Sequence, residues 1–405
     1  MLSNYYTKIS SIFQDVIIKK TDEFQNKITI YAESEVKPHK CPVCGNTTKY
    51  IHDYRTRTIK LSKSFGKNVI VKYRQRRYVC KCCGKRFAEN NSLVAKHHNI
   101  SYELINEVFR RTASEYSFSS ISKELGISVS SVIRIFDLIG YNRPTTLPEV
   151  LAFDEFKGNT GKEKYQVIIT DPNNHEVLDI LPCRKQATLY SYIKQWSREE
   201  RNNVKFFVSD MWKPYHELAD IYLKKATKIV DKYHYIRQIP WAFEAVRKRI
   251  QKKYGKDNRL LFKHSKRTLT MRNTKLNPEQ SERVNYLLYL HDDIRSAYFL
   301  KELFYEIQDS KSPEKAKKLM NEWILIAQNS RLPEYQKCSK TLQQWASSIF
   351  NTFDYPYSNG FTEGCNNKIK VLKRNAYGYR NFDRFRKRIL HMFNYEKLNK
   401  RTAIA

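Results

Sequence analysis

The spacing of hydrophobic and polar positions predicts different kinds of structure along the chain. Residues 67–74 alternate between apolar and polar side chains, which indicates one strand of a hairpin. Apolar positions recur at helical spacing over residues 103–140, which predicts three helices. Short apolar runs at 151–156, 165–170 and 176–181 then predict three strands, the last two flanking a turn.

The pattern after these strands predicts an α/β sheet. We expect a helix over residues 187–200, a strand over 204–210, a helix near 214–223 and a fifth strand over 227–234. Three strands, helix, strand, helix, strand is the order of a ribonuclease-H-like fold. Because the connection contains a helix, the fourth strand should run parallel to the first and beside it.

A further helix is predicted over residues 361–376. Its apolar face carries Cys365, Ile369, Leu372 and Ala376. The opposite face carries Glu363, Asn367, Lys370 and Arg374. The long interval before this helix requires an insertion at 237–345, and basic clusters with the apolar spacing of Val284, Leu287 and Leu288 favour a helical subdomain. Simple packing, DNA contact and dimer contact all remain possible roles for it, and Trp241, Trp323 and Trp345 are interpreted as core residues.

These elements predict a multidomain α+β protein. We expect an N-terminal zinc ribbon, a helix-turn-helix, and a ribonuclease-H-like α/β catalytic core interrupted by a helical insertion. The expected boundaries are an N-terminal segment at 1–35, the ribbon at 36–95, the helix-turn-helix at 100–145, the first part of the core at 149–236, the insertion at 237–345 and the last part of the core at 346–398.

Composition and charge narrow the class of partner. The 405 residues include 74 Lys and Arg against 41 Asp and Glu, a formal charge of +33 that is spread along the chain. This distribution favours a long polyanion, most simply nucleic acid, over the alternative of well-solvated lysine faces. No run approaches the roughly 20 apolar residues of a membrane helix, and no secretion signal is recognisable. The sequence therefore predicts a soluble, cytoplasmic protein.

The cysteines predict a metal site. Two CxxC pairs followed by glycine occur at Cys41 and Cys44 and at Cys80 and Cys83. Two such turns can supply four thiolates to one tetrahedral ion, so we expect one structural Zn²⁺. Cys82 is a spare thiol that could replace a neighbour, although the spacing favours Cys80 and Cys83.

The N-terminal basic residues are candidates for DNA contact. In the predicted ribbon these are Arg74, Arg76 and Arg77 among others, which could grip phosphates or form a solvated surface. Ser128 is a suitable N-cap for a recognition helix that would point Ser130, Ser131 and Arg134 outward. Three-helix clusters without a DNA role share this pattern.

Two acidic residues are candidates for chemistry. Asp154 and Asp210 lie on the two strands that should be neighbours at the centre of the sheet. Two carboxylates held together repel each other unless they share a proton or a cation, so a divalent metal is expected there. The alternative for Asp210 is that it caps the following helix.

Several motifs, in this order, carry a resemblance to a known family. After the ribbon and the helix-turn-helix come FDEF, VSDMWKPY, IVDKYH and SNGFTEGCNNKIKVLKRNAYGYRNFDRFRKR. From about residue 35 to 395 the chain resembles the ISL-three family of bacterial insertion-sequence transposases. Tyr233 departs from the phenylalanine that is common in the family. The resemblance implies that Asp154, Asp210 and Glu363 form a DDE triad that uses Mg²⁺ or Mn²⁺ to cut and join DNA.

The expected function is therefore that of a transposase. It would bind terminal inverted repeats and transfer DNA strands with two metal ions, Asp154 bridging both. Further candidates are Lys370, Lys373 and Arg374 for DNA contact, with His234 and Asn367 as secondary site residues. The family implies at least a homodimer when ends are paired, and a location at the bacterial nucleoid. The alternatives are a non-catalytic DNA-binding regulator derived from a transposase and a nuclease of RNA–DNA hybrids or junctions.

Overall fold

The computed structural model describes residues 15–402, and the side chains of all of these except 256–258 and 397–402. The chain forms two compact units. The first consists of Met1–Asn142 and Lys368–Ala405, and the second of Arg143–Asn367. Among the described residues, no helix has the length and apolar character needed to cross a membrane.

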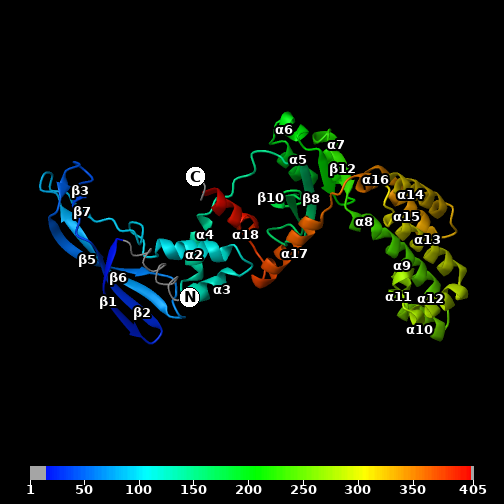
Figure 1. Ribbon diagram of the computed structural model, residues 1–405, viewed down its shortest axis with the longest axis horizontal. Coiled ribbons are helices and arrows are strands. Elements are labelled where there is room, and N and C mark those ends of the chain that lie inside the picture. Colours follow the sequence, from blue (N-terminus) through cyan, green and yellow to red (C-terminus); the bar gives the residue numbers. More distant parts are fainter. Residues whose placement is uncertain (1–14, 403–405) are drawn as a thin grey trace. The chain divides into compact units, whose positions relative to one another are not determined.

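A five-stranded sheet forms most of the N-terminal part of the first unit (Figure 1). Its strands are β1 (Val16–Phe24), β2 (Lys27–Ser34), β5 (Ile51–Lys60), β6 (Asn68–Val79) and β7 (Arg86–Ala88). The predicted hairpin is confirmed, because β5 and β6 pair antiparallel. The short strands β3 (His39–Lys40) and β4 (Thr47–Thr48) pair beside it.

The predicted N-terminal segment does not end as a separate piece at residue 35. Strand β2 pairs in parallel with β6, from Lys27 beside Asn68 to Ala32 beside Tyr73. Residues 16–34 therefore belong to the same sheet as the hairpin, and they share its core. The first 14 residues of the predicted segment lie outside the described residues.

Three helices follow, as the apolar spacing predicts. They are α2 (Tyr102–Thr112), α3 (Phe118–Leu125) and α4 (Val129–Asp137). The predicted cap is confirmed: the Ser128 side chain accepts a hydrogen bond from the backbone N–H of Ser131. Helix α3 ends at Gly126, whose φ of 70° is in the left-handed region that glycine tolerates best.

The C-terminal helix α18 (Phe382–Thr402) packs on this three-helix cluster. Arg388 is fully buried and donates hydrogen bonds to the backbone carbonyls of Ser114 and Tyr116. The imidazole of His391 lies between the Phe109 carbonyl and the Tyr141 hydroxyl. Polar side chains of α18 therefore fix the loops and helix ends of the cluster.

The second unit contains a five-stranded sheet in the order β10-β9-β8-β11-β12. The strands are β8 (Val150–Phe156), β9 (Gln166–Asp171), β10 (Glu176–Leu181), β11 (Phe206–Ser209) and β12 (Thr227–Val230). The first three are antiparallel neighbours, whereas β11 is parallel to both β8 and β12. The prediction that the fourth strand lies beside the first and parallel to it is therefore confirmed.

Alternating residues of the strands face two different layers. Leu151 and Phe153 belong to a core with the helices α5 (Gln186–Ile193) and α7 (Lys213–Tyr222). Ala152 points to the other side, where Val208 and Ile229 pack against Tyr355 and Tyr357. The predicted single helix over 187–200 is wrong, since α5 ends at Ile193 and the short helix α6 (Arg198–Asn202) follows.

The fifth strand is shorter than predicted. It ends at Val230, because the Asp231 side chain accepts a hydrogen bond from the Tyr233 N–H and starts the helix α8 (Lys232–Ile236). His234 therefore lies on a helix and not at the end of a strand. Because α8 begins directly after β12, a side chain of this helix, that of His234, lies close to Asp210 at the carboxyl ends of the strands.

The stretch predicted to be a helical insertion is helical. Between α8 and the last helix of this unit lie α9 (Gln238–Gln251), α10 (Lys256–His264), α11 (Lys266–Thr270), the short 3₁₀ helix η1 (Asn273–Lys275), α12 (Pro278–Leu290), α13 (Asp292–Gln308), α14 (Pro313–Gln328), α15 (Pro333–Gln344) and α16 (Ala346–Asp354). Their shared core includes Trp323, Phe304 and Tyr335. The helix α17 (Gly360–Asn375) follows, one residue longer at its start than predicted and one shorter at its end.

Candidate functional sites

The two CxxC turns of the first unit have the same backbone geometry. The N–H of Gly45 donates to the Cys41 carbonyl over 3.0 Å, and the N–H of Gly84 donates to the Cys80 carbonyl over 2.9 Å. Both glycines have φ near 70°, at 75° and 70°. A residue with a side chain would be strained in this conformation, which explains the glycine after each pair.

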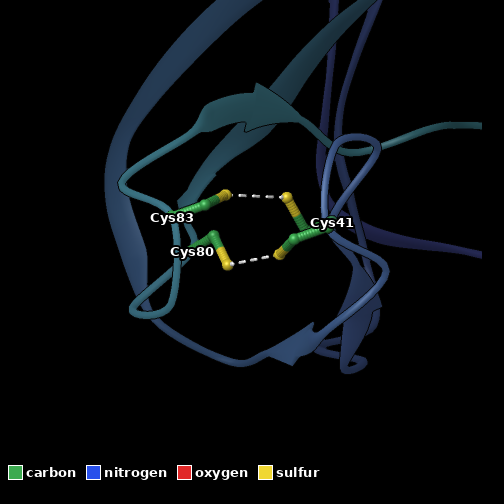
Figure 2. A group of neighbouring side chains, drawn as sticks. Cys41, Cys80 and Cys83 are labelled. Carbon is green, nitrogen blue, oxygen red and sulfur yellow. Dashed lines mark hydrogen bonds between the residues drawn. The ribbon is translucent and has the colours of Figure 1, made fainter.

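The turns bring four thiols together (Figure 2). The Sγ atoms of Cys41 and Cys83 are 3.5 Å apart, as are those of Cys44 and Cys80. All four sulfur atoms lie within 4.8 Å of one another. Tetrahedral Zn²⁺ with bonds of about 2.3 Å places its sulfur ligands roughly 3.8 Å apart, so the cluster fits one zinc ion.

Backbone groups favour the thiolate form that zinc requires. The N–H groups of Cys44 and Val43 lower the pKa of Cys41 to about 6. In the second turn the N–H of Cys83 has the same effect on the pKa of Cys80, which is also lowered. In the same cluster, burial and contact with the neighbouring thiols raise the pKa of Cys44 to about 12, and the pKa of Cys83 is also raised. The predicted structural zinc site is thus supported by the geometry of its four sulfur atoms, and the spare thiol Cys82 is exposed outside that group.

The three arginines predicted to contact DNA from the ribbon have different environments. Arg74 is exposed and its guanidinium lies 3.8 Å from the centre of the Tyr54 ring. Arg77 is half-buried and is 2.9 Å from the Asp53 carboxylate. Arg76 is only 3% exposed and contacts Glu89, so its prediction as a DNA contact is corrected.

Arg76 is buried because β2 covers it. Its guanidinium donates to the backbone carbonyl of Ser34 over 2.6 Å and lies 3.4 Å from Glu33, both on β2. The buried Glu89 also accepts hydrogen bonds from the Tyr73 hydroxyl and the Arg76 N–H. The buried guanidinium of Arg76 therefore holds β2 and β6 together, because a buried arginine needs acidic and carbonyl partners.

The other predicted DNA contacts lie mostly at the surface. On α4, Ser130 and Arg134 are exposed and Ser131 is half-buried. On the second half of α17, Lys370 and Arg374 are exposed and Lys373 is half-buried. Their positions leave them accessible, although no side chain here has a geometry that by itself identifies a ligand.

In the second unit, strand register brings three aspartates to one edge of the sheet. Ser209 pairs with Phe153 on one side and with Val230 on the other, all in parallel strands. The next residue after each is Asp154, Asp210 or Asp231. Each aspartate comes two positions after a residue that packs on one face of the sheet: Asp154 after Ala152, Asp210 after Val208 and Asp231 after Ile229. Because side chains alternate between the two faces of a strand, the three carboxylates point toward that same face.

The start of α17 is fastened to this face of the sheet. The Asn366 side chain donates to Oδ2 of Asp154 over 2.7 Å, and the hydroxyls of Thr362 and Thr170 are 2.7 Å apart. Between them on the helix is Glu363, which is exposed and raises the pKa of Asp154 by electrostatic repulsion. The three acids of the predicted triad are therefore brought to one region, although they are far apart in the sequence.

Two residues of this region were not predicted as site residues. Asp231 accepts hydrogen bonds from the N–H groups of Tyr233 and Asn359, each over 3.1 Å, and so joins α8 to the segment before α17. The recurrence of an aspartate at a strand end could have identified it. Asn366 carries no such signal, because its role depends on the docking of α17 against β8.

Burial and electrostatic repulsion strongly raise the pKa values of the acids Asp154 and Asp210. Burial raises the pKa of Asp154 to about 7, with repulsion from Asp231 and Glu363 adding to the effect. Burial also raises the pKa of Asp210 to about 8, followed by repulsion from Asp154 and Asp231. The secondary candidate His234 has its Nε2 atom 3.0 Å from Asp210, but burial lowers the pKa of this imidazole, so it is mainly neutral at pH 7. Asn367, the other secondary candidate, is exposed on α17.

The carboxylates are less tightly gathered than the thiols. Among the residues whose side chains the structure describes, only the four cysteines form a group of three or more His, Cys, Asp or Glu ligands with all donor atoms within 4.8 Å of one another. A pair of ions about 4 Å apart does not require such close contact among all its ligands, because different acids bind different ions. Oxygen donors that repel each other at short range suit Mg²⁺ or Mn²⁺.

Comparison with known protein families matches both regions. A zinc-finger model from transposases of the elements IS204, IS1001, IS1096 and IS1165 matches residues 37–83, which include all four zinc ligands. A transposase model of the ISL3 group matches residues 151–389, more than half of the chain.

Individual relatives support the same assignment. The transposase of IS1001 from Bordetella parapertussis is 24% identical over 379 residues, covering 88% of this chain and 89% of the relative. The transposase of IS1557 from Mycobacterium tuberculosis is 29% identical over 105 residues, 26% of this chain and 23% of the relative. A Lactococcus lactis protein described as an ATP-dependent protease is 49% identical over only 67 residues, 16% of this chain and 22% of the relative. The chain belongs to the ISL3 (ISL-three) family of transposases.

Proposed function

We propose that this chain is the transposase of a bacterial insertion sequence, which binds terminal inverted repeats and cuts and joins DNA with the DDE triad Asp154, Asp210 and Glu363. The observation that carries the proposal is the parallel register of β8 and β11, which puts the first two acids side by side at the edge where α17 begins. In this proposal the sheet is the core of a ribonuclease-H-like domain.

The three acids would hold two Mg²⁺ or Mn²⁺ ions, which would activate the attacking oxygen and stabilise the leaving one. Burial, and after it repulsion between the acids, raises the pKa values of Asp154 and Asp210, and this supports the assignment because bound cations would relieve the repulsion. Asn366 would orient Asp154 through its 2.7 Å hydrogen bond. Asp231, held by two backbone N–H groups, would keep α8 and α17 in position around the triad.

DNA binding would be the task of the first unit, which includes the second half of α17 from Lys368 onward. In this proposal α2 to α4 form a helix-turn-helix whose α4 presents Ser130, Ser131 and Arg134 to the major groove. Arg74, Arg77 and the basic residues Lys370, Lys373 and Arg374 would contact phosphates. Pairing of two DNA ends would involve a homodimer acting at the nucleoid in the bacterial cytoplasm.

The test is a cleavage and strand-joining assay with the DNA ends of the element and Mn²⁺. Asp154→Asn, Asp210→Asn and Glu363→Gln should each abolish nicked and joined products while the protein still binds the end in a mobility-shift assay. The matched control is Asp220→Asn, which neutralises an exposed carboxylate on α7. Wild-type cleavage by any of the three variants would remove that acid from the triad.

The same assay separates the alternatives. End binding by the wild-type chain without any metal-dependent cleavage would identify a DNA-binding regulator instead. Cleavage of RNA–DNA hybrids or junctions without strand joining would identify a nuclease.

A further inference from the structure

Three side chains, those of Tyr233, Arg237 and Trp241, lie in a row along α8 and the start of α9, and we call this row the column. It follows the acidic edge, which is the edge of the sheet that carries Asp154, Asp210 and Asp231. The guanidinium carbon of Arg237 is 4.0 Å from the centre of the Trp241 ring and 5.4 Å from that of Tyr233. The spacing i, i+4, i+8 places the three on one side of a helix. Backbone hydrogen bonds from Arg237 to Tyr233 and from Trp241 to Arg237 continue this helical path through the junction of α8 and α9.

Both aromatic rings are accessible to solvent. Tyr233 is 56% exposed and Trp241 is 51% exposed, so Trp241 is not the core residue that was predicted. By contrast, Trp323 is fully buried and donates its indole N–H to the Leu300 carbonyl. Exposed aromatic rings occur elsewhere on the chain, as at Tyr289, so what distinguishes these two rings is that Arg237 joins them and that they lie beside the acids.

The column begins next to the acids. Its first residue, Tyr233, follows Asp231 by two positions and donates its N–H to that carboxylate. The ring of the adjacent His234 lies 5.6 Å from the Tyr233 ring, and its Nε2 atom is 3.0 Å from Asp210. A chain bound along the column would therefore have one end within reach of the acidic edge.

The charge of the surrounding surface selects a polyanion. Lys248 on α9 and Lys252 directly after its end continue the same side beyond Trp241, and both are exposed. Lys248 lies 3.8 Å from the Glu244 carboxylate, and its side chain remains open to solvent. Alternation of exposed aromatic rings with cationic side chains is the arrangement that binds single-stranded nucleic acid, because bases stack on the rings and phosphates pair with the cations.

We infer that Tyr233, Arg237 and Trp241 form a stacking surface for unpaired nucleotides, which holds the single-stranded end of a DNA substrate beside the acidic edge. This inference rests on the proposed function for its substrate, but the stacking surface itself does not require catalysis. The three residues are positioning residues: they bind bases and phosphates and take no part in bond breaking.

A different role for the column would be purely structural. Arg237 could simply cover the two rings and stabilise the junction between α8 and α9. In that case loss of Trp241 would change stability but would not change the preference of the protein for nucleotides that carry bases.

The test measures that preference directly. Binding of the full-length, zinc-loaded chain is measured by fluorescence anisotropy, without Mg²⁺ or Mn²⁺, for an oligothymidine of about twelve nucleotides and for an abasic oligomer of the same length. Phosphate contacts elsewhere on the protein contribute to both affinities. The ratio of the affinity for oligothymidine to the affinity for the abasic oligomer therefore measures the contribution of the bases. One stacked base should make the wild-type ratio about tenfold or more.

The variants decide between the two roles. Trp241→Ala should lower the ratio about tenfold, by the loss of one stacked base, Trp241→Phe should restore most of it, and Arg237→Lys should reduce it while keeping the charge. The control Tyr289→Ala removes an aromatic residue that is 81% exposed on α12, and it should leave the ratio unchanged. A wild-type ratio in Trp241→Ala, or an equal loss in Tyr289→Ala, would overturn the inference. Because no catalytic metal is present, this result is independent of the cleavage assay that tests the triad.

Discussion

Lowering the pH from 8 to 6 should weaken metal binding at the acidic edge much more than it would at a site whose carboxylates have unshifted pKa values. Asp154 and Asp210 titrate as an interacting pair with pKa values of about 7 and about 8, raised by burial and then by repulsion from neighbouring acids. Both are protonated at pH 6 and must lose their protons before a divalent ion binds. Metal affinity should therefore rise as the pH increases through this range.

The size of the effect follows from the ionised fractions. With pKa values of about 7 and 8, the doubly ionised fraction is about 0.45 at pH 8 and about 0.0009 at pH 6. The affinity for Mn²⁺ should then fall about 500-fold, or about 3.7 kcal/mol, if both acids must be ionised. If only Asp154 must be ionised, the fall is about tenfold. Two carboxylates with unshifted pKa values near 3.9 would change the affinity by only about 2% over the same range.

Isothermal titration of Mn²⁺ into the zinc-loaded chain at pH 6, 7 and 8 measures this change. Repeating the titration in buffers of different ionisation enthalpy counts the protons that are released, and Asp210→Asn should remove its share of them. The control Asp220→Asn should keep the wild-type dependence, since this exposed carboxylate lies outside the cluster. A dissociation constant that varies less than threefold from pH 6 to pH 8, without proton release, would refute the reasoning.

Three further predictions concern stability. Cys41→Ser should abolish zinc binding and unfold the ribbon, measured by bound zinc and near-ultraviolet circular dichroism, whereas Cys82→Ser should retain the metal; a full zinc content in Cys41→Ser would exclude this ligand set. Burial lowers the pKa of His391 to about 4, below its value in the unfolded chain, so the unfolded state binds the proton first as the pH falls. This residue should therefore lower the free energy of unfolding by about 2 kcal/mol at pH 5 relative to pH 7. Urea titrations of His391→Gln should show a smaller decrease of the free energy of unfolding between pH 7 and pH 5. An unchanged slope in His391→Gln would contradict it. Trp323→Ala should cost about 3–5 kcal/mol, since the ring is fully buried, while the exposed Trp241→Ala should cost much less; equal losses in thermal unfolding would contradict the difference in burial.

Local patterns were sufficient to predict the zinc ligands and most of the elements. The spacing within each CxxC-Gly turn already specifies where two thiols point, because it depends on only five consecutive residues. Likewise, the apolar runs and the Ser128 cap predict strands and helices from neighbouring side chains. The strand order followed from chain connectivity, since a helical crossover makes β8 and β11 parallel neighbours.

Burial of individual charged and aromatic residues could not be predicted in this way. Arg76 lies in the polar run Arg74, Gln75, Arg76, Arg77, which is typical of a surface strand, yet β2 covers it through pairing with β6. Trp241 is a large aromatic residue of a type that is usually mostly buried, yet it is exposed. In both cases the environment depends on an element that is distant in the sequence or on the face that a helix happens to present.

The sequence by itself determined the four sulfur ligands, the alternation of strands and helices, and the presence of Asp154 and Asp210 on two neighbouring parallel strands or directly after them. Only the tertiary structure decided that Asp231 and Asn366 join Asp154 and Asp210, that residues 16–34 complete the N-terminal sheet, and that an aromatic column leaves the acidic edge. The physical reason is the range of the interactions. Backbone conformation responds to nearby residues, whereas desolvation and the pKa of an acid depend on every group that packs against it.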